Sequence, residues 1–282
     1  MPNSKLREII NKADLTAREK QTIEKLMANM NETVFLSGQQ MAAFCDISAT
    51  SMTRLIQKLG YDKFGDFKED FKEVYRATIT PYDMFEDYLN SEHNNEIIQE
   101  SSANTLSNMN GFESMIDEKT LYEVARVIAK ARKVYVVGMF SSEVAVRAIG
   151  YYMYRVGKNC EEITGLGMIN RFEYSNLKPG DVLIAVSTQR IVKEIIQCVD
   201  RAREEQMISV ALTDTYTNPL AKDADYVLTA PVKGLSLDCS PVALISLINI
   251  LMNLVASEMG EEAEQNLSAL AGKYTNRDIF CI

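Results

Sequence analysis

Two pairs of neighbouring hydroxyl side chains are the first groups in this chain that could bind a ligand. Ser141 and Ser142 follow an apolar run at residues 134–138, and Ser187 and Thr188 lie at the end of a second run, 181–187. Each pair precedes a helical stretch, where hydroxyls and free backbone N–H groups together suit a phosphate or a sugar phosphate. Plain capping of the two helices is the alternative that these residues leave open.

A second set of candidate contacts lies on a short predicted helix, residues 49–59. Its apolar residues recur at the spacing of one buried side, and short hydroxyls and basic residues occupy the other side. Hydroxyls and an arginine suit contacts with base edges and phosphates, and a lysine suits a phosphate. The residues expected to contact DNA are Ser48, Ala49, Thr50, Ser51, Thr53, Arg54 and Lys58.

This helix is the last of three predicted N-terminal helices. The first begins after Thr16 and the second after Ser37, each with a Glu or Gln three residues later, which is the spacing of a capping box. A short break at 45–47 separates the second helix from the third. Two short helices joined by such a turn are typical of a helix-turn-helix, whose second helix enters the major groove. A helical hairpin with a solvated outer face is the alternative.

The hydroxyl pairs belong to a region in which strands and helices alternate. Apolar runs predict strands at 134–138, 181–187, 208–213 and 226–229, with a possible short strand within 158–163. This alternation favours a parallel sheet with right-handed crossovers. Ligands of such sheets bind beyond the carboxyl ends of the strands, and both hydroxyl pairs fall there.

Charge is divided unevenly between the two regions. Residues 1–76 carry 12 Lys and Arg against 11 Asp and Glu, whereas the whole chain has a net charge of −9. A DNA-binding module that is nearly neutral must rely on local placement of its basic residues and on dimerisation. The five cysteines are scattered, which favours reduced thiols over disulfides or a zinc site. The single histidine, His93, is expected to be a solvated linker residue.

The length of 282 residues favours two domains. We expect a helix-turn-helix domain at 1–77, a partly helical connector at 78–110 and an α/β domain at 111–282. The most apolar run, 241–256, is interrupted by Ser246 and two asparagines and therefore suits a buried helix better than a membrane span. With no apolar signal region at the N-terminus, a cytoplasmic protein without membrane contact is expected.

Residues 15–71 resemble the helix-turn-helix domain of RpiR/MurR-type bacterial transcription regulators. This resemblance implies an all-helical domain that binds a double-stranded DNA operator. It rests on Leu15-Thr16, Glu19-Lys20, Ser37, Ala42, Ser48, Thr50-Ser51, Arg54, Lys58-Leu59-Gly60-Tyr61, Phe64 and Phe67.

The C-terminal region resembles the SIS (sugar isomerase) phosphosugar-binding domain that follows the helix-turn-helix in RpiR-type proteins. Besides the first loop, the matching residues are Leu212-Thr213-Asp214, Pro219-Leu220 and Ala224-Asp225. The resemblance implies a flavodoxin-like α/β fold, a phosphorylated sugar as ligand, and self-association as a homodimer or homotetramer. The expected ligand contacts are Gly138, Ser141, Ser142, Ser187, Thr188, Gln189, Arg190 and Glu194.

Two departures from the SIS pattern fall within the expected pocket. Phe140 replaces a glycine, and the usual Ser-x-Ser-Gly-x-Thr-x-Glu loop keeps only Ser187 and Glu194. Arg190 stands where a glycine would allow close backbone approach to an anion. It could grip an anion through its guanidinium group. It could instead fill the phosphate position while paired with an acid, or the pocket could have lost its ligand and become a dimerisation platform.

The expected protein is a multidomain α + α/β transcription regulator of the RpiR type, whose operator binding responds to a sugar phosphate or related phosphorylated metabolite in the SIS domain. The alternative is a DNA-binding oligomer whose degenerate SIS domain serves only assembly. An isomerase is less favoured, because isomerisation needs a base and usually an acid. The SIS region has no histidine, and Glu194 is its one acid at a motif position. We expect no catalytic residue, metal or cofactor.

Overall fold

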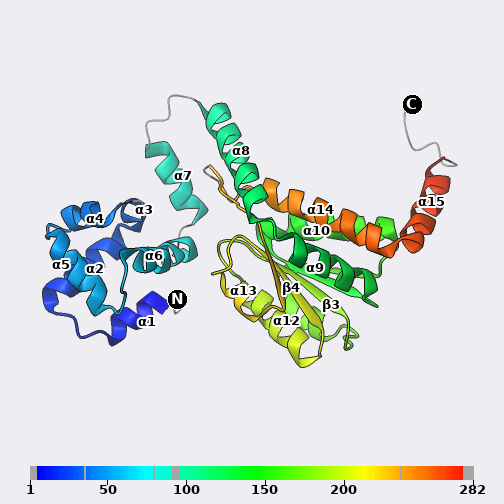
Figure 1. The fold of residues 1–282 in the computed structure, drawn as a ribbon, viewed down its shortest axis with the longest axis horizontal. Coiled ribbons are helices and arrows are strands. Elements are labelled where there is room, and N and C mark those ends of the chain that lie inside the picture. The colour runs from blue at the N-terminus through cyan, green and yellow to red at the C-terminus, as the bar shows by residue number, and fades with distance from the viewer. Residues whose placement is uncertain (1–4, 35, 79, 91–95, 236, 276–282) are drawn as a thin grey trace. The chain divides into compact units, whose positions relative to one another are not determined.

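The computed structural model describes residues 5–34, 36–78, 80–90, 96–235 and 237–275, and the chain divides into two compact units, Met1–Ser91 and Glu92–Ile282 (Figure 1). The division falls inside the segment 78–110 that was expected to connect two domains. The fold class is confirmed: a helical unit precedes a unit built on a parallel sheet.

The first unit is all helical in its described residues. Its helices are α1 (Lys5–Lys12), α2 (Ala17–Ala28), α3 (Met30–Thr33), α4 (Gly38–Phe44), α5 (Ala49–Lys58), α6 (Phe64–Thr78) and α7 (Pro81–Asn90). The capping boxes predicted at Thr16 and Ser37 both form. One side of α5 is buried through Met52, Leu55 and Ile56, as its spacing predicted. The core that receives this side therefore fixes which residues of α5 face solvent.

The second unit alternates strands and helices after two leading helices. Its elements are α8 (Ile97–Met115), α9 (Glu118–Lys130), β1 (Val134–Gly138), α10 (Glu143–Val156), β2 (Cys160–Ile163), α11 (Met168–Glu173), β3 (Val182–Val186), α12 (Lys193–Glu204), β4 (Ile208–Thr213), α13 (Pro219–Asp223), β5 (Tyr226–Thr229), α14 (Val242–Met259) and α15 (Glu261–Thr275). A short 3₁₀ turn at Phe140–Ser142 leads into α10. The five strands pair in parallel in the order β2-β1-β3-β4-β5.

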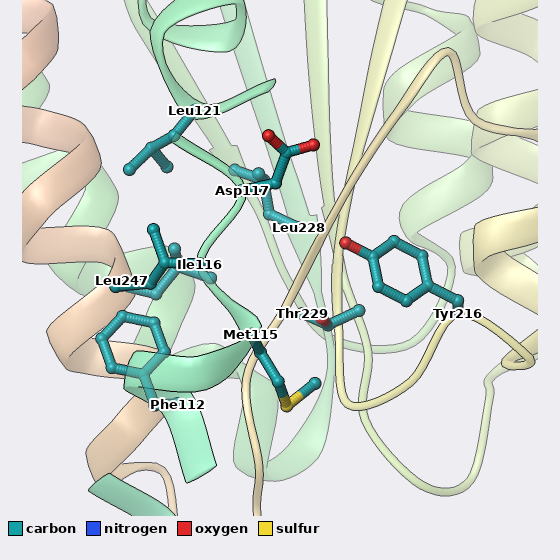
Figure 2. Close-up of a pocket in the computed structure, with 9 residues that line it drawn as sticks. All are labelled: Phe112, Met115, Ile116, Asp117, Leu121, Tyr216, Leu228, Thr229 and Leu247. Atoms are coloured by element: carbon teal, nitrogen blue, oxygen red, sulfur yellow. The ribbon is translucent and has the colours of Figure 1, made fainter. Parts of the chain in front are cut away.

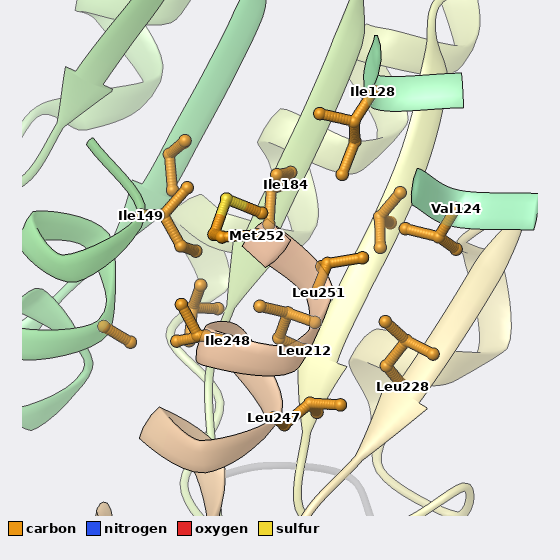
Figure 3. Packing of buried hydrophobic residues seen from close by; sticks show 14 of the residues in the cluster. Val124, Ile128, Ile149, Ile184, Leu212, Leu228, Leu247, Ile248, Leu251 and Met252 are labelled. Carbon is orange, nitrogen blue, oxygen red and sulfur yellow. The ribbon is translucent and has the colours of Figure 1, made fainter. Parts of the chain in front are cut away.

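Two hydrophobic clusters cover the two faces of this sheet. One face packs against α9, α10 and α14, and alternate residues of the same strands pack against α11, α12 and α13 on the other face. Figure 3 shows the first cluster, where Leu247, Ile248 and Leu251 of α14 lie over the strands. By length and composition alone α14 could cross a membrane. In this unit, however, seven of its residues are buried, as expected for a core helix.

Asn108 ties α8 to the segment that follows β5. Asn108 is only 2% exposed. Its Nδ2 donates to the carbonyl of Lys233 at 2.9 Å, and its Oδ1 accepts the N–H of Lys233 at 3.2 Å. The amide thus pairs with both polar groups of one backbone residue, as a neighbouring strand would. This contact attaches the C-terminal half of α8 to the sheet domain.

Candidate functional site

The hydroxyls at the start of α5 are used partly to build the helix. Ser48 Oγ accepts the N–H of Ser51 at 3.1 Å and lies 2.8 Å from Ser51 Oγ, and Thr53 Oγ1 donates to the carbonyl of Ala49 at 3.0 Å. All four residues are nevertheless exposed, as the sequence predicted. Their local bonds orient them rather than bury them, which leaves their oxygen atoms accessible to a partner.

Thr50 and Arg54 are the two expected DNA contacts whose side chains have no hydrogen-bond or ion-pair partner among the described residues. Both are exposed on the outer side of α5. A partner-free guanidinium on the outer side of a capped helix is available for a bidentate contact with guanine or with a phosphate.

Lys58 differs from the other basic residue of α5, because its ammonium group is already paired. Lys58 Nζ lies 2.8 Å from Oε2 of Glu19, the capping-box carboxylate of α2. The hydrogen bond from Lys58 is the largest cause that lowers the pKa of Glu19 to about 2, followed by the bonds from Thr16. A phosphate contact by Lys58 must therefore compete with Glu19.

A groove of about 390 Å³ runs beside α5, between this helix and the start of α4. Gln39, an exposed residue of the first turn of α4, lines it together with Thr53 of α5. The sequence reasoning did not include Gln39 among the candidate contacts. The signal that could have found it is its position just after the Ser37 cap, at the N-terminus of the other helix of the motif.

The two hydroxyl-rich loops of the second unit come together at the carboxyl edge of the sheet. β1 and β3 are adjacent, with Gly138 paired to Val186, while their crossovers run to opposite sides of the sheet order. The loops at Met139–Ser142 and Ser187–Val192 therefore leave neighbouring strand ends. This is the topological switch point at which open α/β sheets bind ligands.

Two serine residues in these loops are buried. The residues Ser142 and Ser187 are 7% and 3% exposed, and neither side chain has a hydrogen bond among the described residues. Neither α10 nor α12 has a side-chain cap at its N-terminus. Neither hydroxyl oxygen is among the fully buried, partner-free atoms of the described residues, so each keeps some exposure and, beside an uncapped helix start, suits contact with an anion. Ser141, by contrast, is exposed.

Gly138 and Phe140 shape the first loop through their backbones. A Cβ at Gly138 would lie 2.7 Å from Cγ2 of Val146, so glycine is required for α10 to pack against β1. Phe140 has φ 54°, in the left-handed region that a glycine adopts easily, and it is 71% exposed. The loop has therefore kept the backbone conformation that a glycine favours although the residue is a phenylalanine.

The second loop is held by an acid on the next strand. Gln189 also has a left-handed backbone, φ 52°, and its N–H donates to Oδ1 of the buried Asp214 at 3.2 Å. Asn218 Nδ2 donates to the same oxygen at 2.9 Å. Arg190 is exposed and makes no ion pair among the described residues. Of the three alternatives for Arg190, pairing with an acid is therefore not what the structure shows.

Glu194 and Thr188 contact protein groups. The carboxylate of Glu194 accepts the N–H groups of Gly167 and Ile169, each at 3.4 Å, and so acts on the N-terminus of α11. Thr188 Oγ1 lies 3.9 Å from Sγ of Cys239, whose pKa is raised to about 12, chiefly by burial. Glu194 thus has a positioning role for α11, and the Cys239 thiol stays protonated at neutral pH.

Figure 2 shows a separate small cavity that lies between α8, α9 and the end of β5. Its volume is about 10 Å³, which is room for about one water molecule. Thr229 lines it, and Thr229 Oγ1 is buried without a partner. This cavity is too small for a metabolite.

Among the described residues there is also no cluster of three or more potential metal ligands, and His93 lies outside those residues.

The fold defines a two-domain protein, in which a helix-turn-helix unit precedes an α/β unit whose candidate ligand site lies at its switch point. Residues 5–77 match the rpiR-family helix-turn-helix domain, and residues 127–253 match the SIS domain. The chain therefore combines the two domains that its sequence predicted, an rpiR-family helix-turn-helix and a SIS domain.

Three similar proteins each match more than half of the chain. An uncharacterized HTH-type transcriptional regulator of Clostridium perfringens is 27% identical over 257 residues, which are 88% of this chain and 90% of the relative. The sugar isomerase domain of an RpiR transcription factor from Sphaerobacter thermophilus matches 62% of this chain and 98% of its own, with 27% identity and a TM-score of 0.59. Vibrio vulnificus NanR, complexed with ManNAc-6P, has the same fold over 96% of this chain and 97% of its own (TM-score 0.60, 18% identity).

Proposed function

We propose that this regulator binds a double-stranded DNA operator through α5 and that a phosphorylated sugar bound at the β1 and β3 loops changes its operator affinity. The observation that carries the ligand half is a pair of serines in loops that follow adjacent strand ends, Ser142 and Ser187, whose side chains have no hydrogen bond among the described residues. The ManNAc-6P complex of the similar NanR fold supports a sugar phosphate as the class of ligand. The protein would act in the cytoplasm, as a homodimer or homotetramer.

The proposed regulation is a linkage between two binding events. A ligand changes operator affinity only by its differential affinity for the DNA-bound and DNA-free arrangements. Two recognition helices on a two-fold operator must be spaced by about one helical turn of DNA, so a small change of spacing is sufficient. Arg190 is suited to hold the phosphate of such a ligand, because its guanidinium is exposed and partner-free.

Catalysis is not part of the proposal. The two acids beside the second loop are already engaged: Glu194 accepts two backbone N–H groups, and Asp214 accepts hydrogen bonds from Gln189 and Asn218. An isomerase would need such a group free to move a proton. The remaining alternative is a SIS domain used only for assembly, which the departures at Phe140 and Arg190 favour.

A thermal-shift screen against hexose, amino-sugar and pentose phosphates and inorganic phosphate tests the ligand half. A ligand at 100 times its dissociation constant stabilises by about 2.7 kcal/mol, which raises the melting temperature by a few degrees. The response should disappear in Ser187→Ala and persist in the control Ser114→Ala, whose hydroxyl bonds only to the carbonyl of Gly111. Silence of the folded wild-type protein across the panel would favour the assembly-only alternative.

The DNA half is tested with operator fragments selected from a random pool. Arg54→Ala is expected to weaken binding by on the order of 1–3 kcal/mol if Arg54 reads a base. The matched control is Arg171→Ala, an exposed arginine of α11 in the other unit. Equal affinity of Arg54→Ala and wild type in a mobility-shift titration would remove Arg54 from the interface.

A further inference from the structure

Among the described residues, four that are not glycine have a left-handed backbone, and two of these four end a helix. Asp46, with φ 55°, lies just past α4, and Gln206, with φ 56°, lies just past α12. In both cases the N–H of the next residue donates to the carbonyl five positions earlier, at 3.0 and 2.9 Å. This is the Schellman motif of helix ends, and its hydrogen bonds account for the left-handed residue.

The other two left-handed residues, Phe140 and Gln189, do not end a helix. Phe140 lies in the loop after β1 and Gln189 in the loop after β3, which are the two loops of the candidate ligand site. The backbone of Gln189 is held by its hydrogen bond to Asp214. Phe140 has no comparable compensation from packing, because its ring is largely exposed. Strained residues of this kind cluster at sites where the side chain serves a ligand.

The position of Phe140 places its ring beside the groups that suit a phosphate. Phe140 begins the 3₁₀ turn that leads into α10, and Ser142 ends this turn. At a rise of about 2 Å per residue, the two backbones are separated by about 4 Å along the turn. A ligand with its phosphate at Ser142 therefore brings its remaining atoms within reach of the Phe140 ring.

A second exposed apolar side chain lies on the same side of the site. β1 and β2 are neighbours, and Phe140 and Leu166 each follow by three positions the last pair of residues that joins these strands. Leu166 is 84% exposed. The polar residues Ser187 and Arg190 follow β3, which lies on the other side of β1. The candidate site is therefore apolar toward β2 and polar toward β3.

We propose that Phe140 determines ligand specificity, because its ring stacks on the carbon face of a closed-ring sugar whose phosphate is held by Ser142 and the β3 loop. The C–H groups on one face of a pyranose pack well against the apolar, electron-rich face of an aromatic ring. Ligand sites commonly combine such a surface with a few polar groups that fix orientation. An open-chain sugar has no such face. Since this role requires a bound sugar phosphate, it rests on the ligand binding proposed above.

Isothermal titration calorimetry of the full-length protein with three probes tests the role of the ring. Glucose 6-phosphate is a closed ring, glucitol 6-phosphate is its open-chain relative, and inorganic phosphate carries no sugar. The wild-type protein should bind glucose 6-phosphate about 10-fold more tightly than either of the other probes. In Phe140→Ala this preference should be lost, while the affinity for inorganic phosphate stays at the wild-type value.

Three further variants separate the ring from its backbone. Phe140→Gly relieves the left-handed backbone as well as removing the ring, so it should lose the preference to the same extent as Phe140→Ala. Phe140→Tyr keeps an aromatic face and should keep the preference. Tyr174→Ala is the matched control, because it removes an exposed aromatic ring at the end of α11, outside both loops, and should bind all three probes as the wild type does.

The outcomes distinguish this proposal from the ligand binding on which it rests. Equal affinity of the wild type for glucose 6-phosphate and glucitol 6-phosphate, or a preference that survives in Phe140→Ala, would overturn the role of Phe140 and leave ligand binding intact. Failure of the folded wild-type protein to bind any of the three probes would refute both. If Phe140→Ala kept the preference but lost self-association in sedimentation equilibrium, the ring would belong to a contact between copies instead.

Discussion

At the scale of single residues, Phe140 pays a conformational cost for the shape of the first pocket loop. Its φ of 54° is unfavourable for any side chain with a Cβ, and its 71% exposed ring gains little from burial. Phe140→Gly is therefore expected to raise the free energy of unfolding by about 1 kcal/mol. Urea denaturation monitored by circular dichroism measures this change.

Phe140→Ala is the matched control, since it removes the ring but keeps the Cβ. It should show none of the gain, because alanine has the same difficulty as phenylalanine in the left-handed region. A gain of equal size in both variants would mean that loss of the exposed ring, rather than relief of the backbone, stabilises the protein.

Glu194 leads to a second prediction about a single residue. Because its carboxylate accepts the N–H groups of Gly167 and Ile169, Glu194→Ala should loosen α11 and cost about 0.5–2 kcal/mol, as loss of a helix cap does. Hydrogen exchange should accelerate first at Gly167–Glu173. Lys193→Ala, at the exposed neighbouring position, should leave exchange there unchanged. Equal exchange in both variants would contradict the positioning role.

At the scale of elements, the pair of Glu19 and Lys58 joins α2 to α5. The pKa of Glu19 is lowered from its ordinary 4.5 to about 2, so the folded state favours the ionised carboxylate. This contribution to stability is present above pH 4.5 and is lost as the pH falls toward 2. Glu19→Gln should therefore melt at a lower temperature than wild type at pH 6, and the difference should shrink by pH 3.

Glu24→Gln is the control for this experiment, because Glu24 is an exposed acid of the same helix for which no ion pair is found among the described residues. Its melting temperature should follow that of wild type at both pH values. If the difference in melting temperature between Glu19→Gln and wild type were the same at pH 6 and pH 3, ionisation of the Glu19 carboxylate would not be the source of the difference.

The elements also show which parts of the structure the sequence could predict. Capping boxes at Thr16 and Ser37 and the buried side of α5 depend on residues within one or two turns, so their spacing predicted them correctly. The parallel pairing of the strands follows from the alternation of strands and helices, as predicted. Lys58 with Glu19 and Asn108 with Lys233 are separated by 39 and 125 positions, and such pairs arise only from tertiary packing. For the same reason the sequence did not reveal that Glu194 accepts the N–H groups of Gly167 and Ile169.

At the scale of the whole molecule, the two compact units are expected to unfold separately. Asn108 belongs to the second unit, where it pairs with both backbone groups of Lys233. Asn108→Ala removes both partly buried hydrogen bonds to the Lys233 backbone and should lower the stability of the second unit by about 1–3 kcal/mol. Hydrogen exchange should accelerate in α8 and the sheet, whereas α4 and α5 keep wild-type rates.

Ile56→Ala supplies the reciprocal test, because Ile56 is buried in the core of the first unit. It should lower the free energy of unfolding of the first unit by about 2–5 kcal/mol. Hydrogen exchange should therefore accelerate in α4 and α5 alone. If either variant accelerated exchange equally in both units, the chain would unfold as one cooperative body. Independent units are what the proposed regulation needs, since a ligand can then alter the spacing of two helix-turn-helix units without disturbing the fold of either one.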